Sequence, residues 1–228
     1  MLMIRNRILV GAFCLAGVTA VAAQTNSQQW RDSLTVLNEQ IRLEPKSVDL
    51  RLRKAAVNIE LNQWDYAAEE YGRVLEMDPD NLSALYFRAY VHNHERHFDL
   101  ARYDYESFLA LVPRHFEAQL GLAMVKRQLG RNSEVVDELN QLVQMFPDSA
   151  MAYAARAGFE SEQLKLDLAV YDWTEAIRLA PDNAEFVVSK VDVLLQLKRK
   201  KEARKEIESA IRRGLPRGAF REWMKRCR

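Results

Sequence analysis

Apolar residues recur along this chain with the period of an α-helix, in short runs separated by polar breaks. The run in the middle of the chain steps by three, one, three and one residues, at Leu82, Leu85, Tyr86, Ala89 and Tyr90. After a break at 94–97 a second run has the same character, with Leu100, Ala101, Tyr105, Phe108 and Leu109. Such spacing keeps the apolar side chains on one helical face. The pattern therefore predicts two short helices within residues 82–115.

The prolines set a fixed register for this pattern. The first five prolines are spaced 34 residues apart, and the sixth follows after 35 residues. They are Pro45, Pro79, Pro113, Pro147, Pro181 and Pro216. Proline has no backbone donor and cannot continue a helix, and it pushes the preceding residue toward an extended conformation. A repeat of this length indicates a helix-turn-helix solenoid.

Alignment on the prolines reveals conserved residue sizes inside the repeat. Two columns hold small residues: Ala55, Ala89, Ala123, Ala157 and Val191 in one, and Ala67, Ala101, Val135, Ala169 and Ala203 in the other. A third column is bulky, with Tyr71, Tyr105, Leu139, Trp173 and Ile207. We expect the small columns to let helices approach closely and the bulky column to fill the space between neighbours.

This combination of period, columns and closing proline resembles the tetratricopeptide repeat (TPR), from about Pro45 to Pro216. The resemblance implies an all-α fold, a right-handed superhelical α-solenoid of five TPR helix-turn-helix units. The chain departs from the family where Val135 and Leu139 replace the commoner Ala and aromatic residue. The predicted units are 48–81, 82–115, 116–149, 150–183 and 184–217, with an N-terminal capping half repeat at 24–47 and a C-terminal capping helix at 218–228. No Pro-rich or Gly/Ser-rich linker interrupts them, so we expect one elongated domain.

The N-terminus has the features of a secretory signal peptide at residues 1–23. Arg5 and Arg7 give a positive start, and the apolar run from Ile8 ends in small residues before Gln24. These features predict cleavage and export. The alternative is a retained membrane anchor, but an apolar run of about 16 residues is short for a bilayer span, which needs about 20. The style of the signal suits a Gram-negative bacterium, so we expect a periplasmic protein.

Charge is unevenly distributed, although the chain has a formal net charge of only +1. Residues 197–228 hold 13 Lys and Arg against 4 Asp and Glu, whereas residues 24–196 hold 18 against 28. The basic patch within the C-terminal segment comprises Lys198, Arg199, Lys200, Lys201, Arg204 and Lys205. One interpretation is contact with an anionic membrane surface or an acidic protein; the other is a solvated turn and helix face. Export argues against nucleic acid as the partner, and any membrane contact is expected to be peripheral.

The resemblance also implies a concave groove lined by the first helix of each unit. The positions that would face it are Tyr86, Tyr90, Asn93, His94, Glu117, Leu120, Met124, Arg127, Gln128, Met151, Ala154, Gly158, Glu162, Glu185, Val188 and Asp192. Tyr and Met provide large, adaptable contact surfaces and are enriched at interfaces. This composition suits a protein or peptide ligand in the groove. The alternative is that Tyr86, Tyr90 and Met124 simply pack between helices.

Some TPR proteins hold the C-terminal carboxylate of chaperones with a clamp of Lys, Asn and Arg. The matching positions in the first two units are Asp49, Leu52, Ala56, Ser83, Phe87 and Tyr90. None of these residues is a Lys, Arg or Asn, so the carboxylate clamp is missing.

Other site chemistry is weakly represented. His92, His94 and His97 lie close together in the sequence, but His92 and His94 are two apart on a helix and point about 200° away from each other. No Cys or carboxylate spacing completes a metal site. Catalytic motifs are missing, and we expect no cofactor. Cys14 falls in the predicted signal peptide, which leaves Cys227 without an internal disulfide partner.

The sequence therefore predicts a non-catalytic scaffold that binds a protein or peptide in its groove, in a complex of the cell envelope. The second hypothesis is a peripheral protein that binds anionic surfaces through its basic C-terminal helices, 197–228. The identity of the partner and the oligomeric state do not follow from the sequence.

Overall fold

A computed structural model of the protein describes residues 27–227, which form helices joined by turns and no strand. The predicted signal peptide lies outside the described residues, as do the start of the half repeat and Arg228. Contacts divide the chain into two compact units, one up to Leu111 and one from Val112. Stacked repeats contact mainly their neighbours, so such a chain has no central core to unite it. The two units are described separately.

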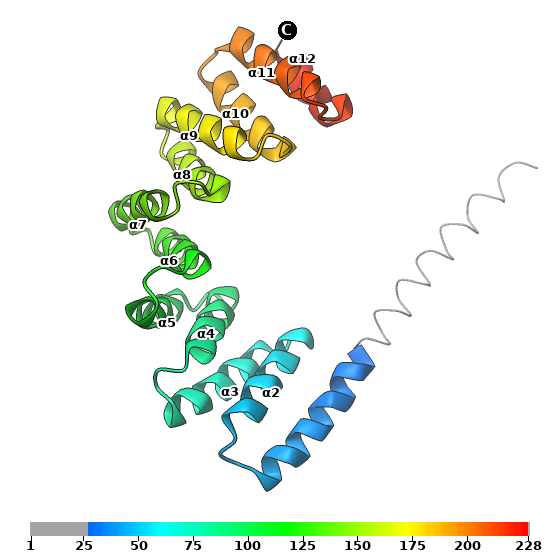
Figure 1. Ribbon diagram of the computed structural model, residues 1–228, viewed down its shortest axis with the longest axis vertical. Helices are drawn as coiled ribbons and strands as arrows, with labels where there is room; N and C mark the ends of the chain where they lie inside the picture. Colours follow the sequence, from blue (N-terminus) through cyan, green and yellow to red (C-terminus); the bar gives the residue numbers. More distant parts are fainter. Residues whose placement is uncertain (1–26, 228) are drawn as a thin grey trace, which may run out of the picture. The chain divides into compact units, whose positions relative to one another are not determined.

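In the first unit, a helix over residues 27–43 precedes two helical hairpins (Figure 1). The hairpins consist of α2 (Val48–Glu60) with α3 (Trp64–Met77) and α4 (Leu82–His94) with α5 (Phe98–Leu111). Each first helix begins at a side-chain cap, where Ser47 accepts from the Leu50 amide and Asn81 from the Ala84 amide. Such caps satisfy backbone donors that the helix itself leaves unpaired.

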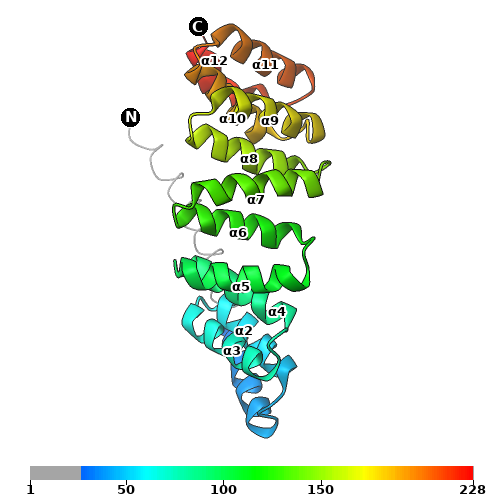
Figure 2. The same cartoon turned by 90° about the vertical axis from the view of Figure 1, so that its left-hand side faces the viewer.

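The second unit repeats the hairpin three times and ends in a short cap. Figure 2 shows its helices stacked in chain order. They are α6 (Phe116–Gln128), α7 (Asn132–Met145), α8 (Ala150–Glu162), α9 (Leu166–Leu179), α10 (Ala184–Gln196), α11 (Lys200–Arg212), the 3₁₀ helix η1 (Arg217–Phe220) and α12 (Arg221–Arg226). Ser149 and Asn183 cap α8 and α10 in the same way as in the first unit.

The turn inside every hairpin contains one residue with positive φ, again at intervals of 34: Asn62, Arg96, Gly130, Leu164 and Lys198. Only Gly130 adopts this left-handed conformation without a Cβ clash. Asn62 is the non-glycine type that tolerates it best, whereas Arg96, Leu164 and Lys198 carry side chains that disfavour it. The regular hairpin geometry is therefore imposed by helix packing on both sides of the turn.

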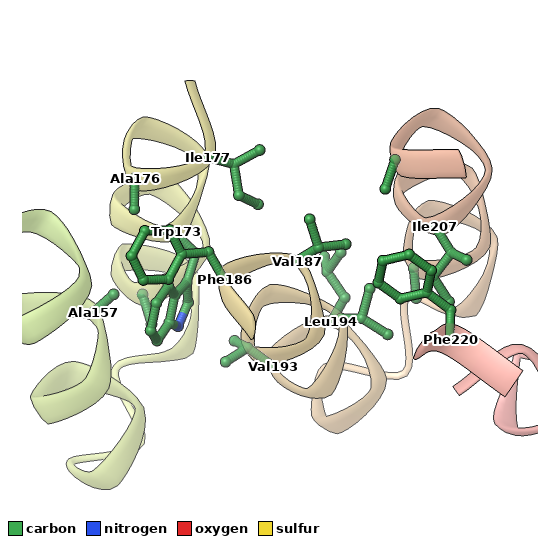
Figure 3. Packing of buried hydrophobic residues seen from close by; sticks show 14 of the residues in the cluster. Ala157, Trp173, Ala176, Ile177, Phe186, Val187, Val193, Leu194, Ile207 and Phe220 are labelled. Carbon is green, nitrogen blue, oxygen red and sulfur yellow. The ribbon is translucent and has the colours of Figure 1, made fainter. Parts of the chain in front are cut away.

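The predicted small and bulky columns form the cores. Ala55, Ala67, Ala89 and Ala101 are completely buried in the first unit, as are Ala157, Ala169, Val191 and Ala203 in the second. In the second unit Trp173 packs on Phe186 with ring centroids 5.8 Å apart (Figure 3). Helix surfaces built from alanine allow close approach, so the columns fix how the helices of each hairpin pack.

The C-terminal cap closes one end of the second unit's core. Phe220 is fully buried beside Leu194 and Ile207 (Figure 3), and Trp223 and Met224 pack against the same cluster. Cys227 is also buried there, and burial raises the pKa of its thiol. The thiol is therefore both enclosed and protonated at neutral pH, which disfavours a disulfide with another chain.

Replacing Ala101 by Trp is expected to destabilise the protein by about 1–3 kcal/mol or more, because a fully buried alanine leaves no room for an indole. Thermal unfolding measures the effect. Ala56→Trp is the matched control, because Ala56 lies exposed on α2 and its substitution should change the melting temperature little. Equal melting temperatures for the Ala101→Trp variant and the wild type would contradict the packing role of this column.

Candidate partner-binding surfaces

The first helix of each hairpin buries one side and exposes the other. We call the exposed side of α2 and α4 in the first unit, and of α6, α8 and α10 in the second, the A-face. The predicted groove residues lie on four of these helices, α4, α6, α8 and α10. Because the two units are described separately, the A-face is considered within each unit.

An exposed aromatic cluster dominates the A-face of the first unit. Trp64, the first residue of α3, stacks on the imidazole of His94 with ring centroids 3.7 Å apart and planes 18° apart. Tyr90 lies one helical turn before His94, with its ring 6.1 Å from Trp64. Phe87 and Tyr90 remain 44% and 43% exposed. The sequence indicated Tyr90 and His94, whereas the contribution of Trp64 appears only in the folded chain.

Two other predicted groove residues of this unit are less accessible. Tyr86 is half-buried, and its ring lies 6.1 Å from that of Tyr105 and 5.6 Å from that of Phe108. It therefore joins the packing between α4 and α5, as the alternative interpretation held for it. Asn93 is half-buried as well.

The A-face of the second unit is lined by methionines and paired charges. Met124 and Met151 are 42% and 50% exposed. Arg127 of α6 donates to Glu162 of α8 at 3.1 Å. The remaining predicted residues divide by accessibility: Glu117, Gln128 and Glu185 are exposed, while Leu120, Ala154, Gly158 and Val188 are half-buried or buried.

Asp192 is already engaged within the chain. Arg226 of the C-terminal cap donates to Asp192 Oδ1 at 2.6 Å. An arginine guanidinium thus forms an ion pair with this A-face carboxylate, as Arg127 does with Glu162.

The charge of the A-face is acidic in both units. Glu60, Glu117 and Glu185 are exposed carboxylates, of which only Glu117 has a partner within the described chain, the imidazole of His115 at 3.5 Å. The two A-face arginines are both paired, Arg53 with Asp49 and Arg127 with Glu162. No unpaired Lys or Arg lies on the A-face within residues 27–227. The surface therefore suits a neutral or basic ligand.

Behind the A-face, a buried ion pair joins the two helices of each hairpin. A basic residue in the first helix meets an acidic residue 16 positions later in Lys54–Glu70, Arg88–Asp104, Arg156–Asp172 and Lys190–Glu206. In the third hairpin Leu122 takes the basic position, and Lys126 reaches Glu138 at 2.7 Å instead. The basic residues at 54, 88, 156 and 190 keep the register of the prolines, a signal in the sequence that was not used to predict these pairs. Removing one partner of a buried pair costs about 3–5 kcal/mol.

The pair in the fourth hairpin has a second carboxyl beside it. Arg156 binds Asp172 through Nε at 2.6 Å and Nη2 at 2.8 Å, and its Nη1 donates to Asn140 Oδ1 at 3.0 Å. Burial raises the pKa of Glu160 to about 7, with the neighbouring Asp172 carboxylate adding to the shift and Arg156 opposing it. Oε2 of Glu160 is buried with no partner among the described residues. The structure thus holds a carboxyl group whose protonated form is favoured by its surroundings.

The predicted basic patch is partly neutralised by its own helix. Arg199 binds Glu202 and Asp167, and Arg204 binds Glu208. Lys198, Lys201 and Lys205 are exposed and make no ion pair within residues 27–227. Lys200 is exposed and has an interaction within the chain. Three lysines therefore remain available to a partner.

The histidines enter separate environments. Nε2 of the half-buried His92 lies 3.8 Å from Asp104 Oδ2, and burial lowers the pKa of His92. His94 instead stacks on Trp64. Across the part of the chain that the structure describes, no three His, Cys, Asp or Glu side chains gather as a metal site requires.

Within residues 27–227, no helix has both the length and the apolar character to cross a bilayer.

The sequence profile of the family described as "Tetratricopeptide repeat" matches residues 52–106, 95–150 and 160–219. The chain therefore belongs to the tetratricopeptide repeat family. Its fold is that of a protein–protein interaction scaffold, and the family's members are generally non-catalytic.

Curated relatives match only in part. Sperm-associated antigen 1 from Mus musculus is 36% identical over 86 residues, which cover 38% of this chain and 9% of that protein. Human peptidyl-prolyl cis-trans isomerase FKBP4 is 31% identical over 88 residues, covering 37% of this chain and 19% of that protein. A Schizosaccharomyces pombe DnaJ homolog subfamily C member 7 homolog is 24% identical, over 82% of this chain and 40% of that protein. The chain thus matches between 9% and 40% of the length of these relatives.

Solved structures share the fold. A tetratricopeptide repeat protein from Parabacteroides merdae superposes with a TM-score of 0.61 at 20% identity, over 90% of this chain and 80% of that one. Pseudomonas aeruginosa pilF gives 0.65 at 14% identity, over 94% and 96%. YrrB, described as a TPR protein with an unusual peptide-binding site, gives 0.60 at 16% identity, over 77% and 90%.

Glu160→Gln is expected to stabilise the protein at pH 8 by about 1–2 kcal/mol, after allowance for solvent screening. The pKa of Glu160 is raised from 4.5 to about 7, so the folded chain binds more protons than the unfolded chain between these values. Wild-type stability should therefore fall as the pH rises from about 4.5 to about 7, and the glutamine variant should lose that component. Melting temperatures at pH 5 and pH 8 test this: the gain should be small at pH 5 and larger at pH 8. A gain that is the same at both pH values would contradict the assignment.

Proposed function

We propose that this chain is a non-catalytic scaffold whose A-face binds an extended or helical segment of a partner protein. The observation that carries the proposal is the exposed cluster of Phe87, Tyr90 and His94, in which Trp64 stacks on the imidazole of His94. Aromatic side chains left at the surface of a helix whose other face is fully packed are typical of interface anchors. Within the second unit, Met124 on α6 and Met151 on α8 present an exposed apolar surface of their own.

The proposed ligand segment is apolar with neutral or basic flanks. Exposed carboxylates at Glu60, Glu117 and Glu185 repel an acidic segment and favour lysine or arginine. Arg127 on Glu162 and Arg226 on Asp192 are examples, within the chain, of guanidinium groups on A-face carboxylates. A basic side chain also gains from the faces of Trp64 and Tyr90 through cation–π contact.

We further propose that the scaffold acts in a cell-envelope complex, in the periplasm. The support is the secretory character of residues 1–23, with a positive start, an apolar run and small residues before Gln24. The ligand would then be a segment of another exported or envelope protein.

The A-face proposal is tested by affinity capture from native envelope extract, with wild type beside a Tyr90→Ala/Met124→Ala variant. The wild type should retain a defined partner that the variant loses, because truncation of exposed anchors at an interface typically costs about 2 kcal/mol or more each. Binding should persist near physiological salt, because its main contacts are apolar.

Tyr66→Ala is the matched control. Tyr66 is an exposed tyrosine of the first unit on α3, outside the A-face, and its loss should leave capture unchanged. Circular dichroism establishes that all variants are folded. Equal capture by the wild type and the A-face variant would overturn the proposal.

The second candidate function is binding to an anionic surface through Lys198, Lys201 and Lys205. These three lysines stand exposed without an ion pair in the described chain, which favours this candidate. Lys201→Gln/Lys205→Gln should abolish cosedimentation with vesicles containing phosphatidylglycerol at low salt. Wild-type binding should itself fade near 0.15 M salt, where the screening length is about 8 Å. Lys198 is left unchanged because its backbone is left-handed. Salt-resistant binding, or binding by the variant, would count against this candidate.

A further inference from the structure

The first unit contains a cavity away from the A-face residues. Its volume is about 450 Å³, and α3, the turn after it, α4 and α5 all contribute to its lining. Its lining is divided about equally between apolar and polar groups. The apolar residues are Leu75, Pro79, Leu85, Ala110 and Leu111, and the polar groups come from Tyr103, Ser107, Asp80 and Arg88. Its size lies within the range of small-ligand sites.

Arg88 lines this cavity, and its guanidinium is only partly used within the described chain. Its Nε and Nη2 donate to Asp104 at 2.8 and 2.7 Å, which holds the guanidinium in a fixed orientation. Its Nη1 has no acceptor within residues 27–227. Gly72 of α3 lies beside that atom, and a Cβ at Gly72 would stand 3.7 Å from Nη1. A polar group that is left unpaired in a partly buried place favours an acceptor from outside.

The second unit shows how the same donor is satisfied when a side chain is present. Arg156 lies 68 residues after Arg88, or two repeats, and binds Asp172 in the same two-point manner. Asn140 lies 68 residues after Gly72, and its Oδ1 accepts from Arg156 Nη1 at 3.0 Å. An amide carbonyl therefore fills the acceptor position that Gly72 leaves empty in the first unit.

Other substitutions between these repeats account for the open space. Ser107 and Ala110 correspond to Glu175 and Arg178 in the second unit, where the two larger side chains form an ion pair at 2.9 Å. Leu85 corresponds to Tyr153. The first unit thus combines a missing acceptor with smaller side chains around the same arginine.

We propose that this cavity is a second binding site, which takes an apolar residue of a partner's peptide chain with its amide carbonyl on Arg88 Nη1. The apolar side chain lies against Leu75, Leu85 and Leu111. An amide fits better than a carboxylate, because Asp104 already neutralises Arg88 and Asp80 adds negative charge at the wall. The site is separate from the A-face, so it stands or falls independently of the function proposed above.

The test is a titration of the full chain with N-acetyl-leucine N-methylamide, followed by two-dimensional ¹H–¹⁵N NMR. A ligand of this size is expected to bind with a dissociation constant of roughly millimolar order. Shifts should concentrate at Leu75, Tyr103, Leu111 and the Arg88 Nε–H. N-acetyl-leucine, with a free carboxylate, should bind no more tightly than the amide.

Gly72→Asn should lower the affinity by about tenfold or more, because the new side-chain oxygen takes the Arg88 donor as Asn140 takes that of Arg156. Gly72→Ala adds a methyl group at ordinary contact distance and no acceptor, so it should bind within about twofold of the wild type. Gly158→Asn is the matched control in the second unit, because a Cβ at Gly158 meets nothing within 4 Å. This variant should bind the probe with the affinity of the wild type. The same spectra establish that each variant is folded.

The proposal is overturned if Gly72→Asn binds as the wild type does, if the shifts fall elsewhere, or if no shift is seen at millimolar probe. Tighter binding of N-acetyl-leucine would overturn the assignment of a neutral amide ligand. Tyr90→Ala should leave this titration unchanged, which separates the result from the A-face proposal.

Discussion

Close contact between helices through small side chains is the constraint on which the rest of each unit depends. Where two helices cross at a fully buried alanine, their backbones approach so closely that few other residues fit. The bulky column, with Tyr71 and Tyr105 in the first unit, then fills the space that remains between hairpins. Because this packing recurs every 34 residues, each first helix buries the same side and exposes the same side. The A-face is a consequence of that regularity.

The same packing allows buried charge. Each hairpin places a carboxylate such as Asp104 or Asp172 between its helices, and an arginine or lysine of the first helix satisfies it. In a low-dielectric environment such a pair is tolerated only when its hydrogen bonds are nearly complete. Arg156 meets that condition with three acceptor contacts. Arg88 lacks the third, and the neighbouring cavity follows from the small residues around it.

The two proposed surfaces use different chemistry. The A-face of the first unit presents aromatic rings and carboxylates in the open, which suits a broad contact with an apolar and basic segment. The cavity at Arg88 is partly open to solvent and offers the oriented guanidinium of Arg88, which suits recognition of one residue. A scaffold with both surfaces has two independent points of attachment within one small unit.

The sequence by itself determined the all-α fold, the TPR family resemblance and the small and bulky columns of the repeat. These features depend on local spacing, and a 34-residue period repeats the same local information five times. Tyr90, Met124 and Met151 were also correctly expected at the surface, because helical periodicity fixes which side a residue takes. The binding roles of these residues stay a prediction.

Only the tertiary structure decided which residues from separate helices meet. Nothing in the spacing shows that Trp64 stacks on His94, that Tyr86 packs against Phe108, or that Arg226 reaches Asp192. These contacts depend on rotamers and on distances between helices, which a one-dimensional pattern does not contain. The cavity beside Arg88 is the clearest case, because it arises from a side chain that Gly72 lacks and from the way three helices surround the gap.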